Sequence, residues 1–401
     1  MKPASFRRPR AKTRAQTCIW ACLLALALGT AVAMPTDVQA QQKGAPKTAQ
    51  KAGPKAAPKG SGGGQQLAPG VRQQGQDVPL DQAGQDNLLG EDDASIDPRQ
   101  HMRNLIGGIS AYARSANSNF VVVTFDGLDL LERVDPVDPK KRAPAATYLH
   151  NIDGVIAPEL SFHPPNDRGD IKTEDKVRDE MLRLIGMGQK RGLRVWTLDY
   201  AKDRAMASEA IRFSLSKSFV PFISMDADYR FNRIPAGRPI NENPNAITGI
   251  NHVKNILFLT DTTAWDTQEE FSLASSNTNY DAIVVDVFHR GRTPLTAHTV
   301  DELKYKKLGA RRLVLAYVDI GHADSSRYYW KQGWREGSPP FIAAPTNANP
   351  DKYTVQYWDP AWRGIIYGNP NSYIYGIIQQ GFDGVVLDGV EAFRVFEGEQ
   401  Q

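Results

Sequence analysis

Residues 381–389 read GFDGVVLDG, a short apolar run that ends in an acid and is bounded by glycine on both sides. Its centre, Gly384–Asp388, has the length and valine content of a β-strand. Similar runs precede it, with polar or amphipathic stretches between most of them, and this alternation indicates an α/β fold with a parallel sheet. The eight candidate strands are Phe120–Phe125, Gly154–Leu160, Arg194–Tyr200, Val220–Asp226, Asn255–Thr260, Asp281–Phe288, Leu313–Ile320 and Gly384–Asp388.

Segments with helical periodicity lie between most of these runs. One such repeat precedes the third strand and ends at Gly192. Eight parallel strands are the number that closes a barrel, so we predict a (β/α)₈ TIM barrel over residues 97–401. A helix at 99–115 precedes the first strand, and only the short stretch Val390–Phe396 follows the last. We expect these two segments to cap the same strand from opposite ends of the chain. The first helix is predicted from Met102, Leu105, Ile106, Ile109 and Tyr112.

The first 40 residues have the features of a secretory signal peptide. Basic and polar residues 1–16 are followed by a short apolar stretch, 17–33. Both cysteines of the chain, Cys18 and Cys22, lie in this segment. The exported chain would therefore hold no disulfide and no thiolate metal site. We predict a secreted or periplasmic protein with no membrane span after cleavage.

Residues 41–96 are rich in Gln, Gly, Ala, Pro and Lys and contain few large apolar side chains. Such a segment buries too little surface to offset the entropy of ordering its backbone. Its lysines recur every four residues, but prolines interrupt any helix they would form. We predict a disordered low-complexity linker here, followed by the barrel domain over residues 97–401.

Charge and motifs exclude several classes of protein. The formal net charge is only +3, and six basic residues precede the first acid, so the rest of the chain is slightly acidic. This balance argues against nucleic-acid binding. The chain has no Gly-rich phosphate loop after a strand, no GxSxG elbow and no HExxH pair. His322 and Asp324 alone offer too few ligands for a metal site. We therefore predict no metal and no cofactor, and we expect a monomer.

Acidic residues end most of the predicted strands. In a barrel of this kind, functional side chains lie at the C-terminal ends of the strands and in the loops that follow. Several carboxyl groups that converge on one mouth are what glycoside hydrolysis requires. We expect Asp199 and Asp226 to be structural, as helix caps or loop contacts. The acids at the strand ends are Asp126, Glu159, Asp199, Asp226, Asp286, Asp319 and Asp388.

Aromatic residues gather in the loops after the seventh strand, at 328–334 and 357–362. Aromatic rings stack on the apolar faces of sugar rings, or they pack the loops onto the barrel. Together with the acids they favour a carbohydrate substrate. We predict sugar binding by Asp126, Asp286, Asp319, His322, Arg327, Tyr328, Tyr357, Trp358 and Asp359.

Several blocks of the barrel region resemble the glycoside hydrolase family 114 superfamily, whose characterised members are endo-α-1,4-polygalactosaminidases. The resemblance covers about residues 99–398 and implies a secreted (β/α)₈ barrel that hydrolyses a galactosamine-type exopolysaccharide without a cofactor. The strand order looks permuted, because the strands from 255 onward resemble the family's first four. The blocks are Lys254–Leu259, Thr278–Asp281, Tyr317–Gly321, Arg327–Trp330, Gln356–Asp359 and Gly381–Asp388.

The resemblance also implies a catalytic pair. The family's catalytic aspartate, at the end of the GxDGVxxD strand, matches Asp388, and its catalytic glutamate, two strands further along the barrel, matches Glu159. One carboxyl group would protonate the leaving oxygen while the other attacks the sugar or activates water. The chain departs from the SIGEAE-like block of related sequences where His322 replaces a carboxylate and Asp319 adds one. Glu391 stands where an aspartate is common.

Two other functions remain open on the sequence. A carbohydrate-binding barrel of the cell envelope without catalytic activity would use the same mouth and would be consistent with His322. An envelope scaffold that holds a partner through residues 41–96 would not depend on the mouth residues at all.

Overall fold

The computed structural model describes residues 97–164, 171–225 and 230–398. The signal peptide predicted for residues 1–40 and the linker predicted for 41–96 lie outside the described residues, and so does Asp226. Within the part of the chain that is described, no helix is both long enough and apolar enough to cross a membrane.

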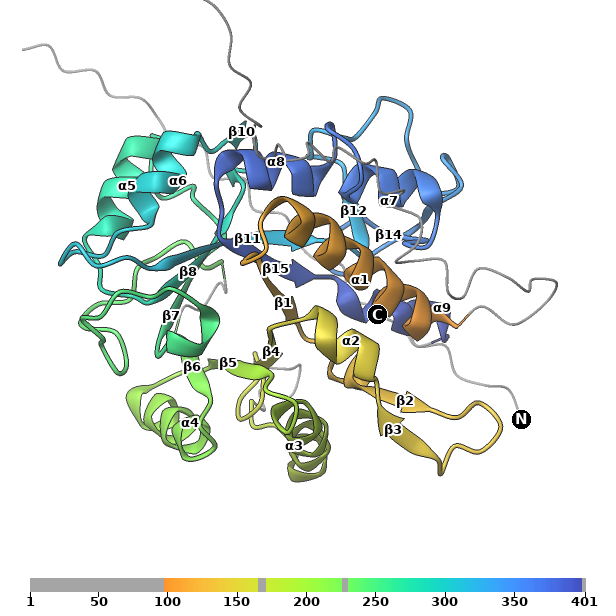
Figure 1. The fold of residues 1–401 in the computed structure, drawn as a ribbon, viewed down its shortest axis with the longest axis horizontal. Helices are drawn as coiled ribbons and strands as arrows, with labels where there is room; N and C mark the ends of the chain where they lie inside the picture. Colours follow the sequence, from red (N-terminus) through yellow and green to blue (C-terminus); the bar gives the residue numbers. More distant parts are fainter. Residues whose placement is uncertain (1–96, 165–170, 226–229, 399–401) are drawn as a thin grey trace, which may run out of the picture. The chain divides into compact units, whose positions relative to one another are not determined.

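Eight parallel strands form a nearly closed sheet with helices around it (Figure 1). Each of the eight predicted strands is present, and its ends differ from the prediction by at most two residues. The strands follow each other around the sheet in chain order, and the last pairs with the first. They are β1 (Val121–Phe125), β4 (Gly154–Pro158), β5 (Arg194–Tyr200), β6 (Val220–Ser224), β7 (Ile256–Leu259), β8 (Ala282–Asp286), β11 (Leu313–Asp319) and β15 (Gly384–Asp388).

Hydrogen bonds connect the strands continuously from β6 through β15 to β7, and β6 and β7 form the two edges of the sheet. Their rings meet across the remaining seam: the centroids of Phe222 on β6 and Phe258 on β7 lie 5.2 Å apart. Phe231 packs against both, at 6.3 and 5.8 Å between centroids. This arrangement is consistent with a (β/α)₈ barrel whose last seam is closed by aromatic packing.

Most helices lie between consecutive strands, as the alternating pattern predicts. The strand residues that form the core are fully buried β-branched and leucine side chains, such as Val122, Ile156 and Leu257. Gly192, with φ 88°, follows the end of α3 as expected. The helices other than the first and last are α2 (Ala146–Asn151), α3 (Asp175–Gln189), α4 (Arg204–Ser216), α5 (Gln268–Ser276), α6 (Ala297–Leu303), α7 (Pro360–Ile366) and α8 (Tyr373–Gln380).

The first and last helices of the described chain meet. Helix α1 (Pro98–Ala116) contacts α2, α8 and α9 (Phe393–Phe396), and Figure 1 shows it between α8 and α2. Arg99 Nε donates to Glu397 Oε1 at 2.8 Å, and the guanidinium carbon of Arg99 lies 5.0 Å from the centroid of the Phe393 ring. Helix α1 therefore occupies the place of the helix that should follow β15. The contact between the two ends of the domain agrees with the expectation that both cap the same strand, which stays a prediction.

Three antiparallel excursions leave the barrel, and the sequence analysis did not predict them. Two are the small ribbons β2 (Glu132–Val134) with β3 (Arg142–Pro144), and β9 (Phe288–His289) with β10 (Thr293–Pro294). The third follows β11 and is a three-stranded sheet in the order β12–β14–β13. Its strands are β12 (His322–Asp324), β13 (Ile342–Pro345) and β14 (Lys352–Val355). We call this third excursion the β12–β14 sheet.

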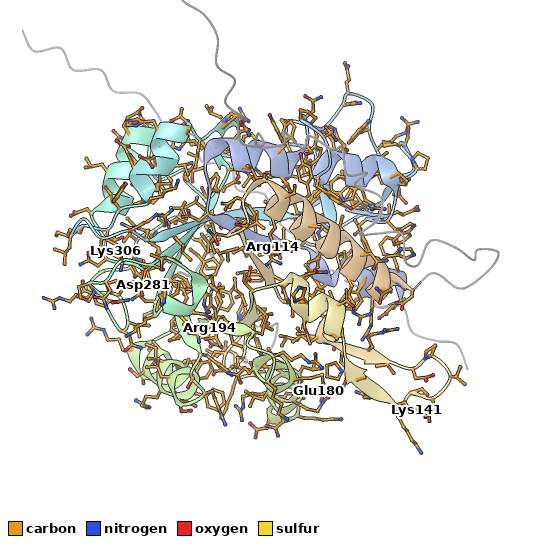
Figure 2. The ribbon with its side chains drawn as sticks, viewed as in Figure 1. Arg114, Lys141, Glu180, Arg194, Asp281 and Lys306 are labelled. Atoms are coloured by element: carbon orange, nitrogen blue, oxygen red, sulfur yellow. The ribbon has the colours of Figure 1, made fainter. Side chains whose placement is uncertain are left out.

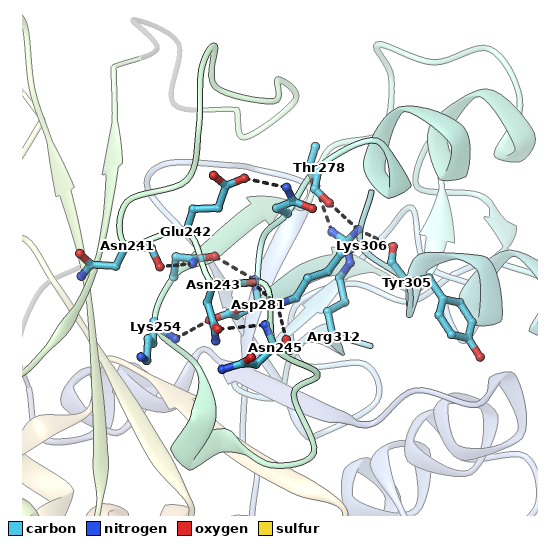
Figure 3. Close-up of polar contacts among 12 residues, drawn as sticks. Asn241, Glu242, Asn243, Asn245, Lys254, Thr278, Asp281, Tyr305, Lys306 and Arg312 are labelled. Carbon is cyan, nitrogen blue, oxygen red and sulfur yellow. Dashed lines mark hydrogen bonds and ion pairs between the residues drawn. The ribbon is translucent and has the colours of Figure 1, made fainter. Parts of the chain in front are cut away.

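A buried ion pair holds the entrance to β7 and β8. Lys306 Nζ lies 2.6 Å from Asp281 Oδ1, and both side chains are almost completely buried. The ammonium also donates to the carbonyl oxygens of Asn243 and Asn245, each at 2.8 Å. Asp281 Oδ2 accepts from the backbone N–H of Lys254 at 2.8 Å. Figure 3 shows this network, and Figure 2 places Lys306 and Asp281 beside β7 and β8.

We expect Lys306→Met to lower the free energy of unfolding by about 3–5 kcal/mol, because it leaves the Asp281 carboxylate buried without its counter-ion. Denaturant-induced unfolding followed by circular dichroism measures this. The matched control is Lys307→Met, a change at the exposed neighbouring lysine, which should stay within about 0.5 kcal/mol of the parent chain. Equal stability of both variants would contradict the role of the ion pair.

Candidate active site

Four neighbouring strands carry a carboxylate at or just after their C-terminal ends. The strands lie in the order β4–β1–β15–β11, and their acids are Glu159, Asp126, Asp388 and Asp319. Asp388 and Asp319 are direct register partners in the parallel ladder. The backbone N–H of Asp126 donates to Ile156 O on β4 at 2.9 Å, so β1 and β4 are in step up to their last residues. The sheet thus brings these acids, which are far apart in sequence, to one edge.

The backbone at this edge is strained. Asp126 and Glu159 have φ of 58° and 59°, in the left-handed region that ordinary residues avoid. Such a conformation costs on the order of 1–3 kcal/mol and persists only where its surroundings impose it. Glycine is required at 389, because φ is 71° and a Cβ would lie 2.2 Å from Asp319 Oδ1. The two loops after β11 and β15 can therefore approach closely.

Asp319 is held as an anion by four neighbouring nitrogen atoms. Its Oδ1 accepts the backbone N–H groups of Gly321 and His322 at 3.0 and 2.9 Å and faces His322 Nδ1 at 3.0 Å, while Lys352 Nζ binds Oδ2. Burial alone would raise the pKa of Asp319, but His322 and Lys352 hold it well below its usual range. In turn, burial lowers the pKa of His322, and Asp319 more than reverses this, so that the net pKa is raised.

Asp388 behaves in the opposite way. Burial and the neighbouring Asp319 raise the pKa of its carboxyl group, and Lys352 counteracts them in part. The Tyr317 hydroxyl donates a hydrogen bond to Asp388 Oδ2. Asp319 and Asp388 are register partners with opposite shifts, so this edge of the sheet holds one fixed negative charge and one carboxyl group that takes up a proton more readily.

Glu391 belongs to the same group, although the sequence analysis did not include it among the site residues. It lies on the short 3₁₀ turn Val390–Ala392 that follows β15. Burial, Asp388 and Asp126 raise its pKa to about 8, and no described residue hydrogen-bonds to its Oε2. The sequence signals were its position three residues after Asp388 and its place where the resembled family commonly has an aspartate.

Glu159 and Asp126 complete the cluster. Burial raises the pKa of Glu159, and Asp126 and Asp199 raise it further, while His163 lowers it. Burial also raises the pKa of Asp126, and Arg394, whose Nη1 is 3.7 Å from Asp126 Oδ2, opposes this. We define the carboxylate cluster as Glu159, Asp126, Asp388, Glu391 and Asp319.

A second polar group lies beside the cluster, on β8 and the loop after β12. Arg327 donates to both oxygens of Asp286, at 3.0 and 2.8 Å. Asp286 is the register partner of Tyr317, which links this pair to Asp388. The Tyr328 ring remains half exposed and contacts Phe288, with 5.7 Å between centroids. Predicted residues 286, 327 and 328 therefore lie next to the carboxylate cluster.

The structure places three of the predicted sugar-binding residues elsewhere. Tyr357 is fully buried and donates from its hydroxyl to Pro98 O at 2.7 Å, at the start of α1. Trp358 packs on Phe396, with 4.7 Å between centroids. Asp359 caps α7 by accepting from the backbone N–H of Ala361 at 2.7 Å. These contacts pack or cap helices. Tyr357 has no exposed surface to offer a ligand, so we correct the prediction at this residue, while sugar binding by Trp358 and Asp359 stays a prediction.

The structural role expected for Asp199 agrees with its contacts. It is fully buried on β5 and accepts hydrogen bonds from the backbone N–H groups of Ser161 and Phe162.

Over the described ranges, no group of three or more His, Cys, Asp or Glu side chains is placed to hold a metal ion. The carboxylate cluster offers proton donors and acceptors of different strength along one edge of the sheet.

Comparison with known proteins identifies relatives but no activity. No family model matches the chain. An uncharacterized protein of Methanocaldococcus jannaschii is 33% identical over 177 residues, 43% of this chain and 48% of that protein. Uncharacterized proteins of Deinococcus radiodurans and Thermotoga maritima are 34% and 30% identical over 115 and 124 residues, or 29% and 31% of this chain and 34% and 36% of theirs. The chain thus spans less than half the length of these relatives.

Replacing Glu391 should change how stability depends on pH. The pKa of Glu391 rises from 4.5 to about 8 on folding. Between these pH values the folded state keeps the Glu391 proton while the unfolded state has lost it, so the free energy of unfolding falls as the pH rises from about 4.5 to 8. Glu391→Gln should therefore be more stable than the parent chain at pH 9, relative to pH 5, by on the order of 2 kcal/mol. Urea unfolding at both values measures the difference.

The control for this experiment is Glu209→Gln, on the exposed face of α4. It should leave the pH dependence of unfolding unchanged. The burial of Glu391 would be contradicted if both variants followed the same curve as the parent chain.

Proposed function

We propose that this protein is a glycosidase and that Glu159 and Asp388 are its pair of carboxyl groups. The observation that carries the proposal is that both side chains have a raised pKa and lie at the C-terminal edge of the sheet, on strands separated only by β1. Glycoside hydrolysis needs one carboxyl group that carries a proton and one that carries a charge. Strand ends in a barrel are where such groups are found.

The surroundings of the two groups suggest a division of roles. Apart from burial, the carboxylates Asp126 and Asp199 favour the protonated form of Glu159, and His163 opposes them. Burial and Asp319 raise the pKa of Asp388, but Asp388 also accepts a hydrogen bond from Tyr317 and faces Lys352, and these two contacts favour its charged form. We therefore assign Glu159 as the general acid and Asp388 as the carboxylate that attacks the sugar or activates water.

The substrate we propose is a galactosamine-type exopolysaccharide, as the resemblance to family 114 implies. The carboxylate cluster supports this choice, because its five acids outnumber the four described basic groups that act on them, His163, His322, Lys352 and Arg394. An amine-bearing sugar would be attracted to such a site. We further propose a complete (β/α)₈ barrel, export by the signal peptide at 1–40, and action as a monomer without a cofactor.

The alternative is a carbohydrate-binding barrel that does not turn its ligand over. Two observations favour it. Lys352 and His322 neutralise Asp319, and His322 stands where the related family has a carboxylate. The half-exposed Tyr328 ring could still stack on a sugar. This alternative predicts oligosaccharide binding with no release of reducing ends.

Glu159→Gln and Asp388→Asn should each reduce the release of reducing ends from deacetylated galactosamine polymer by about 10²–10⁴-fold, with the fold intact. Mass spectrometry of the digest measures this. An aryl glycoside with a good leaving group needs no protonation of that group. Glu159→Gln should therefore recover much of its rate on this substrate, whereas Asp388→Asn should not.

The control is Asp203→Asn, because asparagine also caps a helix and Asp203 lies outside the cluster. It should keep the activity of the parent chain. Parent-like activity in either Glu159→Gln or Asp388→Asn would overturn the assignment of the pair. Tight binding of the polymer without products in the parent chain would favour the non-catalytic alternative.

A further inference from the structure

One buried carboxyl group fixes the turn that carries Glu159. Asp199 lies on β5 with no exposed surface, and its Oδ1 accepts the backbone N–H of Ser161 at 2.6 Å and that of Phe162 at 3.0 Å. Ser161 and Phe162 are the second and third residues after Glu159. A side chain from the neighbouring strand thus binds the backbone of the loop after β4.

This turn needs such support, because Glu159 has φ 59°. Further hydrogen bonds hold the turn from both sides. The N–H of Glu159 donates to Leu198 O on β5 at 2.7 Å, and Thr173 Oγ1 donates to Glu159 O at 2.6 Å. The N–H of Thr173 donates to Ser161 O at 3.1 Å. Asp199 is the member of this network that binds two consecutive N–H groups with a single oxygen.

Asp199 also acts on Glu159 through its charge. Pro158 and Leu198 are register partners, so Glu159 and Asp199, the next residues along, are neighbours at the same edge. Burial raises the pKa of Asp199 to about 6, against the two N–H groups that lower it. The charged groups that face Glu159 are Asp199 on β5, Asp126 after β1, and His163 on its own loop. Among the described residues, none donates to Asp199 Oδ2.

We propose that Asp199 is the positioning residue of Glu159: it holds the left-handed turn that aims the Glu159 carboxyl group and, when charged, it favours the protonated form of that group. This inference rests on the proposed function, in which Glu159 is the general acid. A purely structural Asp199 would affect the folded fraction of the protein and nothing else.

The test compares Asp199→Asn with Asp199→Ala. The asparagine oxygen can still accept both N–H groups but carries no charge. Asp199→Asn should therefore keep kcat at its optimum within about threefold, while the alkaline limb of the pH profile moves to lower pH by about one unit, since Glu159 loses a neighbouring negative charge. Asp199→Ala should lose about 10²-fold in kcat with little change in KM, because the acid is misplaced.

A second measurement separates this proposal from the proposed function. Amide hydrogen exchange at Ser161 and Phe162 should be faster in Asp199→Ala than in Asp199→Asn, and NMR titration of the Glu159 carboxyl carbon should show a lower pKa in Asp199→Asn than in the parent chain. If the parent chain releases no product but these two shifts occur, the positioning role holds and the glycosidase proposal fails.

The control is Asp203→Asn, which keeps the cap of α4 and lies outside the Glu159 turn. It should change neither the exchange rates nor the Glu159 titration. Should Asp199→Ala fail to fold, Asp199→Asn still decides the question through the titration. An unchanged Glu159 pKa and an unchanged pH limb in Asp199→Asn would overturn the charge coupling and, with it, the proposal.

Discussion

The parallel ladders on the two sides of β15 hold the two ends of the described chain in one sheet. On one side β15 pairs with β1, the first strand, and on the other with β11. The contact with β1 is so close that a Cβ at Gly384 would lie 2.2 Å from Val121 O, so only glycine fits there. This pairing also sets Asp388 opposite Asp319 and beside the end of β1, and the carboxylate cluster depends on it.

The acids of the carboxylate cluster differ in their pKa because neighbouring donors and cations stabilise their negative charges to different extents. Asp319 receives backbone N–H groups, an imidazole and an ammonium, and its negative charge is therefore fixed. Asp388, Glu391 and Glu159 are buried near that charge or near other carboxylates, and their protons are bound more tightly. This edge, with one fixed anion and several carboxyl groups of raised pKa, differs from an exposed acidic patch, because those carboxyl groups bind a proton more readily than exposed ones do.

The strands could be predicted from the sequence because each is a local run of apolar residues, and the acids at their ends because they follow those runs directly. Tyr317 and Lys352 could not be predicted in the same way. Tyr317 looks like an ordinary strand residue, and Lys352 reaches Asp319 because β14 pairs with β12, the strand that follows β11. Tyr357 was misjudged because an aromatic in a loop has the same local pattern whether it faces a ligand or packs under α1.

The β12–β14 sheet has a consequence for how this protein can diversify. Two of the four described basic groups that act on the cluster, His322 and Lys352, belong to this excursion and not to the barrel strands. Segments outside the barrel strands tolerate substitution and insertion far better than the strands themselves. A relative with the same eight strands but a different excursion would present the same carboxylates in another state of ionisation. Substrate preference and working pH could then evolve by exchange of one accessory sheet, with the scaffold left untouched.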